Sequence, residues 1–255
     1  MAEGYDDSFT RGAVGRLMRE AVWRRLDALF APGQRVLELG CGTGEDAAHL
    51  AARGVRVLAT DVSGGMLEVT RAKIARLGLE TMVEVRRLDI AALARPSALS
   101  PQPPALFDGA LANFGGLNCV ADLAGVAAGL ARLLRPGAPV ALCVMGPAVP
   151  WEWGWFLRRG EARKALRRLA PGGAAWRGLT ITYPRVGALI KAFAPWFSPR
   201  RVAAVGALLP PSYAEPWASA HPAALWALHR LERRFETLPP LPRLADHYLL
   251  ELERG

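Results

Sequence analysis

The chain has 255 residues, of which 51% are hydrophobic and 22% are charged, and its formal net charge is +9. This composition excludes an intrinsically disordered chain, and the length is sufficient to bury a full core, so we expect a single domain over residues 1–255. The basic excess comes mostly from arginine, and it is compatible with an anionic partner without identifying one.

Cysteine usage and hydropathy restrict the compartment. The three cysteines, Cys41, Cys119 and Cys143, are too few and too scattered for a disulfide scaffold or a zinc site, which indicates a reducing compartment and no metal. The acidic N-terminal stretch is not followed by an apolar segment, so we expect no signal peptide. The longest uncharged stretch, Gly137 to Trp151, is broken by prolines and is shorter than the roughly 20 apolar residues of a spanning helix. The sequence therefore predicts a cytoplasmic protein.

The first part of the chain alternates between two hydrophobic periods. Apolar residues at helical spacing predict a helix over about 14–30, which ends at Pro32-Gly33. Short buried runs then alternate with helical patterns, which is typical of βαβ units and a parallel sheet. The predicted strands are 35–39, 55–60, 82–89, 106–114 and 139–145, and the predicted helices are 45–53, 65–77 and 123–134.

This regularity ends after Gly146. A segment rich in tryptophan and arginine comes first, and a second irregular segment rich in proline and aromatic residues follows later. The remaining patterns predict strands over 179–183, 201–208 and 247–252, and helices over 185–193 and 222–236. We therefore expect a core of residues 1–146 and two inserted segments, 147–200 and 209–245, that form a lid.

One glycine-rich turn carries most of the chemical information. Glu38-Leu-Gly40-Cys-Gly42-Thr-Gly44 stands between the first strand and the next helix, where open α/β sheets bind ligands. The spacing differs from the G-x-G-x-x-G of dinucleotide sites, and the acidic Glu45 and Asp46 that follow would repel a phosphate. Asp61 ends the second strand, where a carboxylate can accept hydrogen bonds from ribose hydroxyls.

These residues resemble the class I S-adenosylmethionine-dependent methyltransferases. VLELGCGTG is similar to the first motif of that family, ATDVSGGML to the second, LDI (88–90) to the third, FDGALANF to the fourth, and LLRPGAPVAL to its helix–Pro-Gly–strand segment. The resemblance covers about residues 10–145 and implies a Rossmann-like, doubly wound α/β fold with a seven-stranded sheet and an antiparallel last strand. It also implies S-adenosylmethionine as cofactor, bound by Glu38, Gly40, Cys41, Gly42, Gly44, Asp61, Val62, Met66, Asp89, Ile90, Asn113 and Phe114.

For the methyl acceptor, the resemblance implies only which segments of the chain cover it. Insertions after the fifth strand resemble those of small-molecule members, including the quinone C-methyltransferase type, in which such segments cover the acceptor. The candidates for this lid are Trp151, Trp155, Arg158, Tyr213 and Trp217. Tyr213 and His221 are weak catalytic candidates, because they fall in an irregular segment that could reach the pocket. No [DN]-P-P-[YF] string follows the fourth strand, so the mechanism of amino-methylating nucleic-acid enzymes is not supported.

Three functions remain open at this point. The leading hypothesis is a methyltransferase that acts on a small hydrophobic or aromatic acceptor by direct in-line transfer. The second is an RNA or protein methyltransferase that uses the basic insertion, although no RNA-binding module is visible and we expect no DNA partner. The third is a non-catalytic S-adenosylmethionine-binding or membrane-surface protein, since the tryptophans and arginines could pack, bind substrate or lie at a membrane. The sequence gives no oligomeric state.

Overall fold

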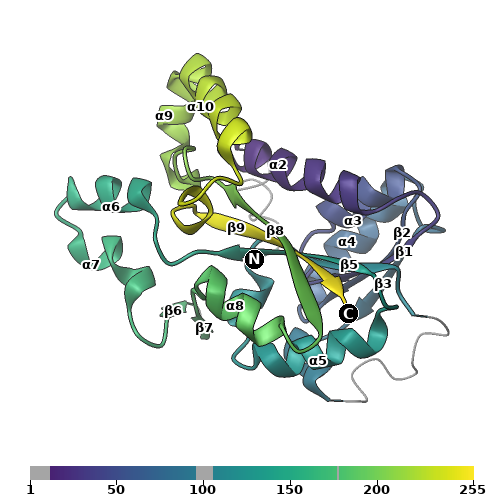
Figure 1. Cartoon of the computed structure of the whole chain (residues 1–255). Coiled ribbons are helices and arrows are strands. Elements are labelled where there is room, and N and C mark those ends of the chain that lie inside the picture. The colour runs from purple at the N-terminus through teal and green to yellow at the C-terminus, as the bar shows by residue number, and fades with distance from the viewer. Residues whose placement is uncertain (1–11, 96–105, 177) are drawn as a thin grey trace.

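The computed structural model describes residues 12–95, 106–176 and 178–255. Its centre is a seven-stranded sheet in the order β3-β2-β1-β4-β5-β9-β8 (Figure 1). Strands β1 to β5 run parallel, whereas β9 is antiparallel to both of its neighbours. This arrangement confirms the predicted fold class. The strands are β1 (Arg35–Leu39), β2 (Arg56–Asp61), β3 (Val83–Arg87), β4 (Gly109–Ala112), β5 (Pro139–Met145), β8 (Phe197–Val205) and β9 (His247–Arg254).

Helices cover both faces of the sheet because successive strand residues point to opposite sides. In β1, Val36 belongs to the core on one face and Leu37 to the core on the other. The first core contains residues of α2 (Ala13–Leu29), α3 (Glu45–Ala52) and α4 (Gly64–Arg76). The second contains residues of η2 (Ile90–Ala94), α5 (Leu123–Leu133) and α8 (Val186–Phe193). The chain is therefore doubly wound.

Local chemistry explains several boundaries. Asp122 caps α5, because its Oδ1 accepts a hydrogen bond from the Gly125 amide at 2.8 Å. The fourth strand is shorter than the predicted 106–114, since the chain leaves the extended conformation at Phe114, whose φ is +45°. Strand β8 begins and ends a few residues before the predicted strand over 201–208.

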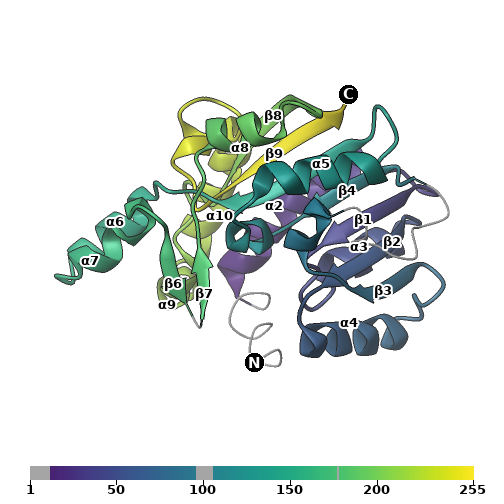
Figure 2. The same ribbon diagram turned by 90° about the horizontal axis from the view of Figure 1, so that it is seen from below.

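The first inserted segment is an arm, which we define as residues 147–184. It contains α6 (Pro150–Leu157), α7 (Ala162–Ala165), η4 (Arg167–Leu169), β6 (Ala174–Trp176) and β7 (Leu179–Ile181). Figure 2 shows α6 and α7 extending away from the sheet on the side opposite to β3. The predicted insertion, 147–200, is longer than this arm. The structure instead packs α8 into the core, because Leu189 and Phe193 are fully buried against the sheet.

The second inserted segment packs against the first helix of the core. It contains η5 (Ser212–Ala214), α9 (Glu215–Ala220), α10 (Pro222–Phe235) and η6 (Leu241–Arg243), and α10 lies above α2 in Figure 1. A carboxylate ties the two parts together, since Glu215 Oε1 accepts a hydrogen bond from the Ala13 amide at 2.7 Å. Within the described ranges, no helix has the length and apolar character needed to cross a membrane.

Candidate active site

A pocket of about 520 Å³ opens at the carboxyl ends of β1, β2 and β4. This edge of an open parallel sheet is where ligands bind in such folds. We call it the cofactor pocket. The residues predicted for the cofactor that line it are Gly40, Cys41, Gly42, Asp61, Val62, Met66, Asp89, Ile90, Asn113 and Phe114.

Two glycines of the turn after β1 have different surroundings: Gly42 faces the pocket, and Gly44 packs against a helix. Gly42 and Gly44 both adopt positive φ, at +54° and +77°. A Cβ added at Gly42 would meet nothing within 4 Å, so this backbone borders open space in the pocket. A Cβ at Gly44 would lie 2.6 Å from Thr70 Cγ2, which means that Gly44 allows α3 to approach α4. Gly44 is thus a structural glycine that does not line the pocket.

Asp61 is fixed by the backbone around it. Its Oδ2 accepts a hydrogen bond from the Gly42 amide at 3.0 Å, and its Oδ1 accepts one from the Ser63 amide at 2.8 Å. These two bonds orient the carboxylate at the pocket wall while each oxygen keeps further acceptor capacity. This geometry fits a ribose diol, as the resemblance implies.

A buried cluster of charge lies at the base of the turn. Asp46 accepts hydrogen bonds from Arg19 Nη1 at 2.9 Å, from Trp23 Nε1 at 2.7 Å and from Asn113 Nδ2 at 2.8 Å. Glu38 is 1% exposed, and its Oε2 has no hydrogen-bond partner. Burial raises the pKa of Glu38 well above its usual range, and the neighbouring carboxylate of Asp46 raises it further.

This cluster favours a cationic ligand. Asp46 and Asp61 lie in the pocket wall, and both raise the pKa of the buried Glu38 carboxyl behind it, whereas Arg19, which pairs with Asp46, lowers that pKa. A positive charge in the pocket would offset that repulsion, whereas a pyrophosphate would add to it. The carboxylates of the pocket wall therefore fit a cofactor that carries a sulfonium and an ammonium group. Among the described residues, no group of His, Cys, Asp or Glu could hold a metal ion.

The opposite wall comes from the ends of β3 and β4. Asp89 caps η2, with its Oδ1 accepting from the Ala91 amide at 3.0 Å. Ile90 and Phe114 supply apolar surface, and the guanidinium of Arg19 lies 5.0 Å from the Phe114 ring centroid. Arg19 and Asp46 both line the pocket, and neither was among the predicted cofactor residues. Sequence spacing could not identify them as a pair, because they meet only when α2 packs on α3.

The predicted lid residues gather away from the cofactor pocket. Trp155 packs against Tyr213 with ring centroids 5.8 Å apart, and Trp151 packs against Trp217 at 6.0 Å. His221 is exposed and stacks on Trp217 at 5.0 Å. The structure therefore brings the aromatic candidates together as one cluster, but none of them, nor Arg158, lines the cofactor pocket.

A buried ionic network anchors the arm to β9. The guanidinium of Arg168 pairs with Glu152 of α6 at 2.6 Å and with Asp246 at 2.5 Å. Asp246 Oδ2 also lies 2.9 Å from His247 Nδ1, and the His247 ring meets the Phe114 ring edge-on at 5.3 Å. Although burial opposes ionisation, Arg168 and His247 hold the pKa of Asp246 well below its usual range. The network thus joins the arm to the wall of the cofactor pocket.

Comparisons with known proteins agree with this geometry. Residues 36–137 match a family model described as "Methyltransferase domain". The chain is 34% identical over 163 residues to the demethylmenaquinone methyltransferase of Clavibacter sepedonicus, an alignment that covers 63% of this chain and 59% of the relative. It is also 34% identical over 175 residues to ribosomal RNA small subunit methyltransferase A of Anaeromyxobacter dehalogenans, covering 63% and 60%.

The fold has counterparts among solved structures. An S-adenosylmethionine-dependent methyltransferase from Mesorhizobium loti superposes with a TM-score of 0.58 and 21% identity, covering 93% of this chain and 100% of that one. At this identity the match speaks for the fold alone. The chain spans about three-fifths of the two curated relatives above, and the acceptors in their printed names differ in kind.

Proposed function

The chain belongs to the class I S-adenosylmethionine-dependent methyltransferases, and on this premise we propose that it methylates a small hydrophobic acceptor. One observation carries the methyltransferase assignment. The cofactor pocket combines an open glycine turn at Gly42 with an Asp61 carboxylate held by backbone amides and a cluster of carboxyl groups that repel one another. S-adenosylmethionine supplies an electrophilic methyl group on a sulfonium, so its charge complements that cluster.

The residues of the pocket have separate tasks in this proposal. Asp61 accepts hydrogen bonds from the ribose hydroxyls, and Gly42 lets the backbone approach the ligand without a side chain between them. Asp89 and the Ile90 amide are assigned to the adenine by the family resemblance. Because methyl transfer needs alignment of nucleophile, methyl carbon and sulfur, the main contribution of the protein is orientation and exclusion of water.

The acceptor class is supported by the arm and by the relatives. Apolar surface for the acceptor lies at the cofactor pocket itself, which is lined by Ile90, Phe114 and, from the arm, Leu179, and several relatives are named demethylmenaquinone methyltransferases. A hydrophobic ring compound such as a quinol fits both observations. An RNA acceptor is the second candidate, favoured by the ribosomal RNA methyltransferase relative and the exposed arginines of the arm.

Calorimetric titration with S-adenosylmethionine tests the cofactor assignment. We expect Asp61→Ala to weaken binding by about 1.5–3 kcal/mol, because the ribose hydroxyls lose a charged acceptor. Glu68→Ala is the matched control, since Glu68 is an exposed carboxylate on α4 outside the pocket. Equal affinities for the wild type and Asp61→Ala would contradict the assignment, as would tighter binding of NAD.

A product assay then separates the acceptor classes. The protein is incubated with S-adenosylmethionine and a panel of quinols, phenols, amines and thiols, and methylated products are detected by mass spectrometry. A methylated small molecule supports the proposal. Transfer to RNA alone, with a steep fall in binding as salt rises, would favour the second candidate. Cofactor binding without any product would indicate a non-catalytic binding protein.

A further inference from the structure

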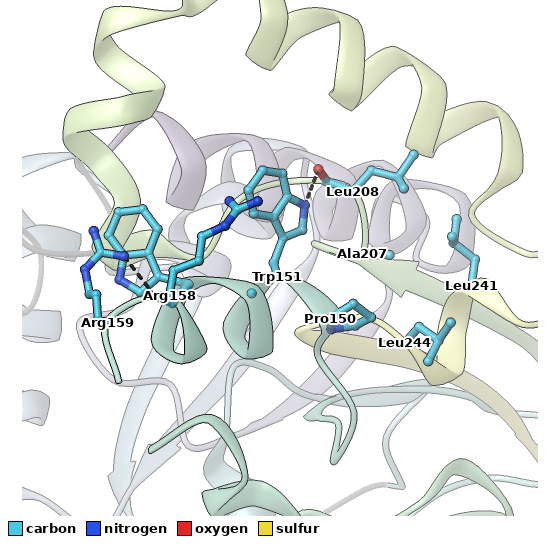
Figure 3. A pocket seen from close by; sticks show the side chains of 10 residues that line it. Pro150, Trp151, Arg158, Arg159, Ala207, Leu208, Leu241 and Leu244 are labelled. Carbon is cyan, nitrogen blue, oxygen red and sulfur yellow. Dashed lines mark hydrogen bonds between the residues drawn. The ribbon is translucent and has the colours of Figure 1, made fainter. Parts of the chain in front are cut away.

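A second cavity, of about 630 Å³, opens between α6, the end of β8 and η6. We call it the arm cavity. It shares no lining residue with the cofactor pocket, and its volume lies within the roughly 300–1,000 Å³ typical of small-molecule sites. Figure 3 shows Trp151 at its centre, with Arg158 and Arg159 on one side and Leu241 and Leu244 on the other.

One end of the arm cavity is apolar. Leu208, Leu241 and Leu244 line it and are only half-buried, so hydrocarbon surface remains accessible beside Pro150. Covering such surface is favourable by about 25 cal/mol per Å² of apolar area removed from water. This end of the cavity therefore fits a hydrocarbon chain.

The middle of the cavity is an aromatic wall formed by Trp151 and Trp155. Trp151 Nε1 donates a hydrogen bond to the Leu208 carbonyl at 2.9 Å. The Arg159 guanidinium lies 3.7 Å from the Trp155 ring centroid, and its Nη1 donates to the Trp155 carbonyl at 2.9 Å. These contacts hold both indoles in place, and the guanidinium of Arg159 covers part of the Trp155 ring.

Arg158 gives the other end a positive charge. Its side chain is exposed at the cavity rim, and within the described part of the chain it forms no ion pair. A cation beside an apolar, fixed wall attracts an anion attached to a hydrophobic body, because each half of such a ligand meets a complementary surface.

We propose that the arm cavity binds a single-chain anionic amphiphile, with its hydrocarbon chain against Leu241 and Leu244 and its carboxylate or phosphate at Arg158. This ligand is distinct from the methyl acceptor, since the cavity does not border the cofactor pocket. The same two indoles also pack against Trp217 and Tyr213, so the arm cavity adjoins the aromatic cluster.

Calorimetry with decanoate below its micelle concentration tests the proposal on the full chain. We expect saturable binding of one decanoate, weakened roughly ten-fold in Arg158→Gln, because that variant loses the charged contact. Arg163→Gln is the matched control, since Arg163 is an exposed arginine of the arm that does not line the cavity. Decanol, which has the same chain without the charge, should bind more weakly than decanoate and equally to the wild type and to Arg158→Gln.

A second readout separates the arm cavity from the cofactor pocket. Cys119 is exposed and lines the cofactor pocket, whereas Cys41 and Cys143 are buried. S-adenosylmethionine should therefore slow alkylation of Cys119 by iodoacetamide, and decanoate should leave its rate unchanged. S-adenosylmethionine binding by Arg158→Gln should equal that of the wild type. A failure of the amphiphile proposal is therefore distinguishable from a failure of the proposed function.

Several results would overturn the proposal. Equal weakening by Arg158→Gln and Arg163→Gln would indicate a diffuse attraction to charge instead of a site. Association with anionic vesicles in the absence of decanoate binding would assign the arm to a membrane surface. Protection of Cys119 by decanoate would place the amphiphile in the cofactor pocket.

Discussion

The cofactor pocket and the arm carry opposite charge and are held together in different ways. The carboxylates of Asp46, Asp61 and Asp89 line the cofactor pocket and favour a cationic ligand, and Arg19, which also lines it, is paired with Asp46. The arm is dominated by arginines, of which only some meet carboxylates. A net charge of +9 therefore describes neither site, because acidic and basic residues are distributed unequally between the two.

The same two regions differ in what keeps them folded. The core residues are buried in two continuous apolar layers, one on each face of the sheet. Few of the described arm residues are buried, and its helices α6 and α7 contain only eight and four residues. Helices this short have little stability of their own, so the arm depends on its attachment points. The largest expected effect therefore lies at the buried Arg168.

Arg168→Leu should detach the arm from the core. The substitution leaves Glu152 and Asp246 without their shared cation, and breaking a buried ion pair from one side costs about 3–5 kcal/mol. Urea unfolding measures the global loss, and limited proteolysis locates it, with new cleavage expected between residues 147 and 184. Far-ultraviolet circular dichroism checks that the sheet remains folded.

Arg163→Leu provides the control for that substitution. Arg163 is an exposed arginine of the same arm, so its loss should change the free energy of unfolding by less than about 0.5 kcal/mol. If the two variants were equally stable, the ionic network would not anchor the arm.

Glu38→Gln tests the carboxyl group that is buried behind the cofactor pocket. Because burial raises the pKa of Glu38, the folded protein favours the neutral carboxyl and loses stability as pH rises from the unfolded pKa, about 4.3, through the folded pKa. The variant has no charge to lose. Its stability relative to the wild type should therefore rise with pH, by about 1.4 kcal/mol for each unit by which the pKa is raised.

Thermal unfolding followed between pH 4 and pH 8 measures this effect. Because the folded protein favours the neutral Glu38 carboxyl, which glutamine mimics, the same variant should bind S-adenosylmethionine with nearly the wild-type affinity. The pH dependence of stability therefore changes in Glu38→Gln while cofactor affinity does not. A constant difference in stability across the pH range would contradict the prediction, because it would mean that Glu38 has the same pKa in the folded and unfolded states.

The sequence was most informative where local pattern and tertiary structure depend on the same residues. Gly42 and Asp89 follow strands of the parallel sheet and Asp61 ends one, so the order of the strands alone places them at one edge. By contrast, Asp46 meets Arg19 and Asn113 from elements far apart in the chain, and no spacing rule pairs them. Their contact depends on how α2 and β4 pack on α3.

The arm shows the same limit more strongly. The basic run that includes Arg158, Arg163 and Arg168 looks uniform in sequence, yet the structure gives these residues different surroundings. Arg168 is buried between carboxylates, Arg158 lies at the rim of a cavity, and Arg163 is exposed outside that cavity. Composition could not separate them, because the difference arises from η4 folding back toward β9.

The smallest expected effect is that of Arg159 on the Trp155 ring. Trp155 is half-buried and Arg159 is exposed, and a cation over an indole at the protein surface contributes about 0.5–1 kcal/mol, so Arg159→Ala should lower the free energy of unfolding by about that amount. A double-mutant cycle with Trp155→Leu isolates the pair, because Arg159→Ala should have almost no effect once the ring is absent. An undiminished effect in the Trp155→Leu background would assign the stabilisation to the hydrogen bond with the Trp155 carbonyl instead, since that backbone acceptor survives the substitution.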